Sequence, residues 1–180
     1  MKRGNRILSY YPIFLGISGK RCVVIGGGEV ALRKVRALVE HEAEVKVISP
    51  DLCPELSQMA EKKTIHILQR SYDRGDLQGA FIAIAATDDG EINCKVAEEA
   101  RARGILVNVV DDPEHSDFIV PSYLRRGALT IAVSTAGRSP ALARKIRTKL
   151  EEEFGAEYAS LALLIDEVRS ELKRQGIKVN

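Results

Sequence analysis

The sequence predicts an α/β protein built mainly on a Rossmann-like parallel sheet with helices on both faces. Short apolar segments alternate with segments of helical periodicity between residues 21 and 110, and short links join them. A glycine-rich turn, Gly26–Gly28, lies directly between the first apolar segment and the first helical one. Such alternation is typical of parallel strands joined by right-handed helical crossovers.

The first half of this pattern predicts two strands and two helices. Residues 21–25 form a short apolar run, and a helical pattern follows over residues 29–40. Residues 44–48 are expected to form the second strand. A short helix is expected within residues 51–63, where Pro54 either occupies the first turn or delays the start.

The second half of the pattern adds three strands and a longer helix. Residues 64–68 alternate between polar and apolar side chains, whereas residues 80–86 are apolar on both faces, as in a central parallel strand. Residues 87–89 supply oxygen atoms that cap the next helix, and Gly104 ends it. Residues 105–110 are expected to form the last strand of this sheet.

The alternation stops after residue 111. Residues 118–121 and 129–133 are strand-like, and a turn is predicted around Arg126 and Gly127. The pattern of alternating strands and helices therefore changes at this point of the chain.

Two helical segments end the chain. Ser139 as N-cap and Pro140 in the first turn are a pair suited to helix initiation. In the second segment, apolar residues recur at a 4-3-4-3-4 spacing from Phe154 to Leu172, a heptad-like seam of less than three heptads. The seam fits an internal core stripe and a partner helix equally well.

Composition narrows the class of protein. The chain has 180 residues, of which 45% are hydrophobic and 29% charged, as in an ordinary soluble globular protein. No apolar run approaches the roughly 20 residues that span a bilayer, and the basic N-terminus is followed by no clean cleavage site, so neither membrane insertion nor export is predicted. The three cysteines form no CxxC pair, which favours a reduced, cytoplasmic protein.

Charge is unevenly distributed, although the net charge is only +2. Residues 118–150 contain no Asp or Glu and seven basic residues: Arg125, Arg126, Arg138, Arg144, Lys145, Arg147 and Lys149. This basic segment favours an anionic partner, and a solvated basic helix face is the alternative. The segment has few aromatic residues for stacking bases, so no nucleic-acid partner is predicted.

The glycine-rich turn predicts a dinucleotide site. Gly26, Gly28 and Ala31 fit the pattern G-x-G-x-x-A between a strand and a helix, although a tight structural turn would use the same residues. Asp51 follows the second strand, where an acidic residue binds the adenosine ribose, and N-capping of the next helix is its other possible role. No arginine adjoins Asp51 to bind the 2′-phosphate of NADP, which favours NAD over NADP.

Polar residues follow two strands at the edge where ligands collect in open α/β sheets. Thr87 comes after one strand and Asp111 after the next. Asp111 is therefore a candidate for acid–base chemistry, with a cap or a turn as the alternative. Asp112 and Pro113 are typical of a turn. The three histidines lie far apart in the sequence and do not show the short spacing of metal ligands, so no metal site is predicted.

Six segments occur in an order that characterises one protein family. They are Tyr11-Pro12-Ile13-Phe14, Val24–Ala31 with Arg33-Lys34, Ala85–Asp89, Asn108–Asp111, Phe118–Ser122, and Val133–Pro140 with Leu142-Ala143-Arg144. Over residues 11–150 the chain resembles precorrin-2 dehydrogenase, the oxidase module of siroheme synthases.

The resemblance implies NAD-dependent oxidation of precorrin-2 to sirohydrochlorin, with sirohydrochlorin ferrochelatase activity left open because only some members have it. It implies a homodimer with an NAD-binding domain over residues 1–112, a dimerisation region over 113–138 and a C-terminal helical domain over 139–180. The family's essential aspartate falls on Asp111, either as the base or as a group that positions substrate.

The resemblance also implies the contact residues. The candidate cofactor contacts are Gly26, Gly28, Glu29, Val30, Pro50, Asp51 and Thr87. Precorrin-2 is a polycarboxylate, which suits the basic segment, and Arg138, Arg144 and Lys145 are the candidate substrate contacts. A non-catalytic NAD(H)-sensing module is the alternative function, since it needs the glycine-rich turn but neither Asp111 nor the basic segment.

Overall fold

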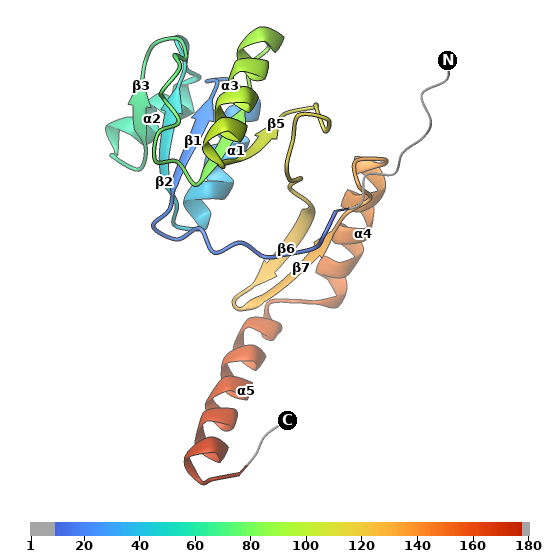
Figure 1. Ribbon diagram of the computed structural model, residues 1–180. Coiled ribbons are helices and arrows are strands. Elements are labelled where there is room, and N and C mark those ends of the chain that lie inside the picture. The colour runs from blue at the N-terminus through green and yellow to red at the C-terminus, as the bar shows by residue number, and fades with distance from the viewer. Residues whose placement is uncertain (1–9, 178–180) are drawn as a thin grey trace. The chain divides into compact units, whose positions relative to one another are not determined.

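The computed structural model describes residues 10–177. The chain divides into two compact units, Tyr10–Ile119 and a second unit that contains everything described from Val120 onward. Figure 1 shows the elements of both units. None of the described helices is long and apolar enough to cross a membrane.

The first unit is built on a five-stranded sheet with the strand order β3-β2-β1-β4-β5. All neighbouring strands are parallel. The sheet confirms the predicted strands, with β3, β4 and β5 shorter than expected: β1 Arg21–Ile25, β2 Glu44–Ile48, β3 His66–Leu68, β4 Ile82–Ala85 and β5 Leu106–Val109.

Helices cover both faces of this sheet, which explains why its central strands are apolar throughout (Figure 1). α1 (Glu29–Glu40) packs on the face that contains Val24 and Ile84. α3 (Gly90–Arg103) packs on the opposite face, which contains Val23 and Ala83. The alternation of side chains along each strand therefore divides the core into two layers.

The helix termini follow the predicted local signals. α2 (Pro54–Glu61) begins with its proline in the first turn. The Asp89 side chain caps α3 by accepting hydrogen bonds from the backbone N–H of the second and third residues after it, at 2.9 and 3.2 Å. Gly104 ends α3 in the left-handed region, with φ of 68°.

The strand predicted at residues 118–121 is wrong, because the next strand begins only at Ser122. The chain before it instead follows the free edge of β5. The Asp117 backbone N–H donates to the Val107 carbonyl at 2.8 Å, and the Val107 N–H donates to the Asp117 side chain at 3.0 Å. This loop satisfies polar groups of an edge strand that would otherwise remain unpaired.

The second unit contains a two-stranded antiparallel sheet and two helices. β6 (Ser122–Arg126) and β7 (Leu129–Val133) pair across the turn predicted at Gly127. Ser139 caps α4 (Pro140–Glu153) by accepting from the Leu142 N–H at 3.3 Å. α5 (Glu157–Arg174) follows, and none of its residues is buried.

A buried carboxylate holds the chain between β3 and β4 against α3. Glu99 is only 3% exposed. It accepts hydrogen bonds from the Tyr72 hydroxyl, from the Gly75 N–H at 2.9 Å and from Arg103 Nε at 2.7 Å. Burial by itself would raise the pKa of Glu99, but these hydrogen bonds outweigh burial and lower it.

Glu99→Gln is expected to lower the free energy of unfolding at neutral pH by about 1–3 kcal/mol, because the neutral amide loses charge-assisted hydrogen bonds. The folded-state pKa lies below the ordinary value of 4.5, so the carboxylate's contribution is complete above that pH and is lost as pH falls through the folded value. Urea unfolding should therefore separate the variant from the parent at pH 7 and bring them together in acid. The exposed neighbour offers the control Glu98→Gln, and equal stability of both variants at pH 7 would contradict the assignment.

Candidate functional site

The glycine-rich turn passes between the carboxyl ends of three strands. Gly26 has φ of 122°, and a Cβ there would lie 2.3 Å from the Ala86 carbonyl oxygen. A Cβ on Gly27 would lie 1.9 Å from the Asp51 carbonyl oxygen. Both positions therefore require glycine for the fold itself.

Gly28 differs from its two neighbours. It is the N-cap of α1, it makes no side-chain cap, and a Cβ on it would meet no atom within 4 Å. The first N–H groups of α1, at Glu29 and half-buried Val30, have no acceptor within the helix. Open space beside free N–H groups at a helix N-terminus fits the pyrophosphate of a dinucleotide.

The segment after β2 is fastened to this turn. Ser49 is buried and its hydroxyl donates to the Asp51 carbonyl at 2.7 Å, while the Cys53 N–H donates to the Gly27 carbonyl at 2.8 Å. Pro50 and the Asp51 side chain are exposed. The N-cap of α2 is Cys53, so the alternative role of Asp51 as a helix cap is wrong.

Thr87 lies beside the turn, at the end of β4. Its backbone nitrogen would be 3.4 Å from a Cβ on Gly26. Its hydroxyl lies 2.8 Å from the Asn93 side-chain oxygen and accepts from the Asp89 N–H at 3.2 Å. The backbone of Thr87 thus borders the candidate cofactor site, and its hydroxyl orders the start of α3.

Asp111 lies just beyond β5 in an uncommon backbone conformation. Its φ is 58°, in the left-handed region that aspartate tolerates better than most residues. Hydrogen bonds fix the chain on both sides: Val110 N–H to the Ala85 carbonyl at 2.9 Å, and Asp112 N–H to the Val109 carbonyl at 3.2 Å. The Asp111 side chain is exposed. The fold therefore holds a carboxylate at the carboxyl edge of the sheet.

Asp112 has a different role from its neighbour. Its carboxylate accepts from the backbone N–H groups of Glu114 and His115, both at 3.1 Å, and lies 2.6 Å from His115 Nδ1. Burial opposes ionisation of Asp112, but the contacts with His115 outweigh it and lower the pKa. Asp112 thus forms the turn that was predicted before Pro113, and it engages His115.

Sequence reasoning missed a polar contact between α1 and β5. Lys34 Nζ lies 3.3 Å from the Asn108 side-chain oxygen, and the Asn108 amide donates to the Phe118 carbonyl at 3.0 Å. Burial and then Arg33 lower the pKa of Lys34, while Asp111 acts in the opposite direction. A polar residue in an otherwise apolar strand was the available signal, but its partner is 74 positions away.

A second unpredicted cluster lies near the glycine-rich turn. Potential ligand atoms of Glu29, Cys53 and Glu55 lie within 4.8 Å of one another, the one such group of three among residues 10–177. The spacing of the histidines gave no indication of it. With Asp51 two positions before Cys53, this cluster makes the end of β2 acidic.

The basic segment belongs to the second unit. Within the described residues, the side chains of Arg138, Arg144 and Lys145 are exposed and form no ion pair. Arg126, in contrast, donates to the Phe154 carbonyl at 3.1 Å, and Arg147 pairs with Glu151. The three candidate substrate contacts are therefore free to bind an anion.

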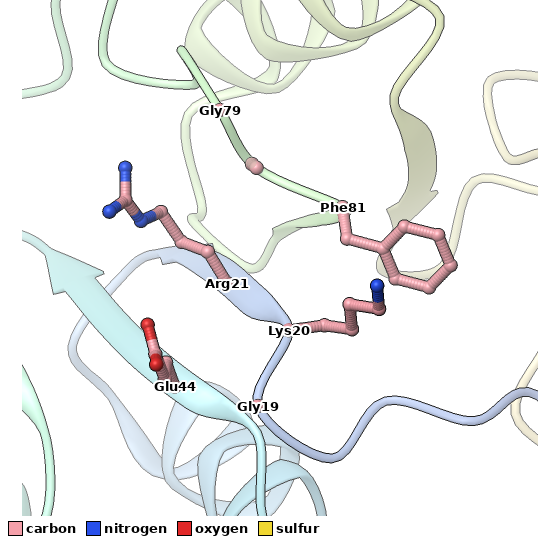
Figure 2. Close-up of a pocket in the computed structure, with 7 residues that line it drawn as sticks. Gly19, Lys20, Arg21, Glu44, Gly79 and Phe81 are labelled. Carbon is pink, nitrogen blue, oxygen red and sulfur yellow. The ribbon is translucent and has the colours of Figure 1, made fainter.

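A shallow pocket of about 470 Å³ occurs at the opposite edge of the sheet from the glycine-rich turn. Figure 2 shows it at the amino ends of β1 and β2, where the Lys20 ammonium lies 5.8 Å from the centre of the Phe81 ring. Because ligands of open α/β sheets bind at the carboxyl ends of the strands, this pocket is not the candidate cofactor site.

Comparison with known proteins identifies related sequences and a related fold. A family model described as putative NAD(P)-binding matches residues 13–122, and one described as sirohaem biosynthesis protein central matches residues 126–153. The chain is 45% identical over 166 residues to the siroheme synthase of Chromobacterium violaceum, which covers 92% of this chain and 35% of that protein. It is 42% identical to the siroheme synthase of Thioalkalivibrio sulfidiphilus, covering 92% and 34%. The chain thus spans about a third of the length of these relatives.

A solved structure described as SirC, precorrin-2 dehydrogenase, has a similar fold. The TM-score is 0.76 and the identity 25%, over 95% of this chain and 83% of that one. This likeness extends over both units. The matched family model covers more than half of the chain and contains the glycine-rich turn, Thr87 and Asp111. The chain therefore belongs to the putative NAD(P)-binding family, and it continues into the central segment of sirohaem biosynthesis proteins.

Proposed function

We propose that this chain catalyses the NAD-dependent oxidation of precorrin-2 to sirohydrochlorin. The related siroheme synthases and the similar precorrin-2 dehydrogenase structure support this substrate. The observation that carries the proposal is the position of Asp111 relative to the glycine-rich turn.

Ile25, Ala85 and Val109 are aligned in register at the ends of β1, β4 and β5. The glycine-rich turn follows the first of these residues, and Asp111 comes two positions after the last. Neighbouring strands are about 4.8 Å apart, so Asp111 lies roughly 10 Å across the sheet edge from the turn. A dinucleotide bound at α1 can extend over that distance toward Asp111.

The reaction removes a hydride and a proton from the tetrapyrrole. When bound, NAD supplies the hydride acceptor. The turn and the α1 N-terminus would hold its phosphates, and the Asp111 carboxylate accepts the proton as general base. The backbone hydrogen bonds on either side of Asp111 keep this residue at the carboxyl edge of the sheet.

The acidic end of β2 favours NAD over NADP. Asp51 supplies a carboxylate for the adenosine ribose, and Glu29 and Glu55 add negative charge nearby. A 2′-phosphate at this position would be repelled, since no basic side chain belongs to the cluster. Exposed Pro50, directly before Asp51, is the remaining candidate contact at this end of β2.

The substrate's carboxylates bind to Arg138, Arg144 and Lys145, which are exposed and unpaired within the described residues.

Arg144→Ala should raise KM for precorrin-2 about tenfold, because one charge-assisted hydrogen bond contributes roughly 1.5–3 kcal/mol. Titration with NAD should give an unchanged Kd. Arg169→Ala, on exposed α5, is the control. If the KM of Arg144→Ala equals that of the parent at low and at moderate salt, the basic face of α4 contacts only solvent and does not bind the substrate.

The active form is a homodimer, with residues 113–138 as the dimerisation region. Leu161, Ile165 and Val168 of the heptad-like seam are 46–50% exposed, which leaves the middle of the seam uncovered within the chain. Sedimentation velocity should give the mass of a dimer at micromolar concentration. A monomer whose mass does not change with concentration would reject this assignment.

Cys22, Cys53 and Cys94 are all free thiols, which supports function in the reducing cytoplasm. Burial raises the pKa of Cys22 to about 11, so this thiol stays protonated and unreactive at neutral pH. If the assignment is right, protein from cells lysed in denaturant with excess iodoacetamide should carry three carbamidomethyl groups by mass spectrometry.

An anaerobic assay with purified protein, precorrin-2 and NAD tests the proposed activity directly. Formation of NADH together with sirohydrochlorin supports it. Binding of NAD without turnover would instead indicate an NAD(H)-sensing module. A second reaction with sirohydrochlorin and ferrous or cobalt ion tests for chelatase activity.

A further inference from the structure

The loop between β3 and β4 is bonded to the segment that follows β2. The Ser49 N–H donates to the Leu68 carbonyl at 3.3 Å, at the carboxyl ends of β2 and β3. The side-chain amide of Gln69, the first residue of the loop, donates to the Pro50 carbonyl at 3.3 Å. Pro50 directly precedes Asp51, the candidate contact of the adenosine ribose. The start of this β3–β4 loop therefore borders the ribose end of the proposed cofactor site.

Arg70 comes directly after Gln69, and its side chain is bound within the same loop. Its guanidinium donates two hydrogen bonds to the Asp76 carboxylate, at 2.6 and 2.7 Å, and one to the Ser71 carbonyl at 2.9 Å. The Asp76 side chain is only 8% exposed, whereas that of Arg70 is 47% exposed. Asp76 is itself fixed, because it also accepts from the Asp73 N–H at 2.8 Å. A bidentate pair with a fixed carboxylate holds the guanidinium in one geometry.

This ion pair occupies the basic group that a different dinucleotide would require. Arg70 is the one basic residue in the two segments that meet at this corner of the sheet, residues 49–53 and 68–71. A dinucleotide site accommodates the 2′-phosphate of NADP through an arginine near the ribose. A guanidinium binds phosphate oxygens with the same N–H groups that it offers to a carboxylate. Asp76 already engages those groups of Arg70 and cancels its charge.

From these contacts we infer that Asp76 is a specificity-determining residue: by binding Arg70, it keeps the cofactor site selective for NAD over NADP. The inference rests on the cofactor site proposed above and deepens it. A 2′-phosphate would have to displace a buried, bidentate carboxylate before Arg70 could bind it, whereas the 2′-hydroxyl of NAD needs no cation. The Arg70–Asp76 pair thus adds to the repulsion of a 2′-phosphate by the acidic end of β2.

Binding measurements on the unliganded protein test this role. Asp76→Asn removes the charge but keeps an oxygen that can accept from the Asp73 N–H, so the loop should keep its turn. By isothermal titration, the Kd for NADP should fall about fivefold or more, while the Kd for NAD stays within about twofold of the parent's. The gain should shrink between about 50 and 500 mM salt, because it comes from a charge interaction. An unchanged Kd for NADP in the variant, with thermal unfolding like the parent's, would overturn the inference.

Further variants separate the release of Arg70 from the simple loss of a negative charge. Asp76→Ser leaves the guanidinium a single hydroxyl oxygen and should give at least the gain of Asp76→Asn. In the Asp76→Asn background, Arg70→Gln should return the Kd for NADP to the parent's value. Arg74→Gln, which removes an exposed arginine of the same loop, should leave the gain intact. A gain that survives Arg70→Gln would come from the lost negative charge alone and would overturn the inference.

The same titrations distinguish this inference from the proposed function, because they contain no precorrin-2. A shift toward NADP in a protein that does not oxidise precorrin-2 would support the role of Asp76 and reject only the proposed activity. Oxidation of precorrin-2 with NAD, together with unchanged NADP affinity in Asp76→Asn, would reject only the role of Asp76. A parent chain that binds neither dinucleotide would overturn both, since the cofactor site itself would be wrong.

Discussion

Replacing Asp111 by alanine is expected to lower kcat for precorrin-2 oxidation by at least about a hundredfold, since positioned general bases contribute roughly 10²–10⁴ in rate. Asp111 is an exposed carboxylate at the carboxyl edge of the sheet, and hydrogen bonds fix the backbone on either side of it. The proposed cofactor contacts lie around the glycine-rich turn and do not include this side chain. The Kd for NAD should therefore remain nearly unchanged while anaerobic NADH formation falls.

Two further variants separate chemistry from structure at this position. Alanine tolerates the left-handed backbone less well than aspartate, and φ at Asp111 is 58°. Asp111→Asn keeps a residue suited to that conformation and removes only the charge, so its thermal unfolding should match the parent and its kcat should fall as far. Asp112→Ala should cost much less activity, because the Asp112 carboxylate stabilises the turn that follows it by accepting two backbone hydrogen bonds. A folded Asp111→Asn protein with the parent's rate would remove Asp111 from the mechanism.

Gly28→Val is expected to weaken NAD binding about a hundredfold or more while the protein stays folded. A Cβ at Gly28 meets no protein atom within 4 Å, so the fold accepts a side chain there. The space it would fill is the approach to the free N–H groups of α1, where the pyrophosphate is expected to bind. Isothermal titration with NAD and thermal unfolding measure the two effects separately.

The neighbouring glycines provide contrasting controls. Gly26→Ala would force a Cβ to within 2.3 Å of the Ala86 carbonyl oxygen, so this change should lower stability as well as binding. Gly16→Val, also at an open position, should leave both unchanged. Unaltered NAD affinity in Gly28→Val would mean that the turn is structural and that the dinucleotide binds elsewhere.

Local signals in the sequence predicted most elements of the fold. The proline in the first turn of α2, the carboxylate cap of α3 at Asp89 and the hydroxyl cap of α4 at Ser139 all lie where expected. Each depends on atoms a few residues apart, so short-range patterns are sufficient to reveal it. The apolar runs of β1 and β4 likewise correctly indicated strands that are buried on both faces of a parallel sheet.

Two predictions failed, one because of a distant partner and one because of a local turn. Residues 118–121 contain strand-forming side chains, yet the residues just before them bond to the edge of β5 and delay the next strand to Ser122. Phe154 was expected to start the last helical seam, but it ends α4 and packs against Tyr158. Intrinsic propensity was overridden in the first case by the hydrogen bonds of an edge strand, and in the second by a turn.

The sequence by itself determined the fold class, the turn that fits a dinucleotide and the candidacy of Asp111, because periodicity, glycine spacing and strand ends are local features. Only the tertiary structure decided that Asp111 is held in the left-handed region and that Lys34 meets Asn108 across 74 positions. It also decided that Leu161, Ile165 and Val168 in the middle of the seam remain exposed within the chain. Such contacts depend on strand register and on which helix packs on which face, and those are fixed by the summed packing of the whole core rather than by any one segment.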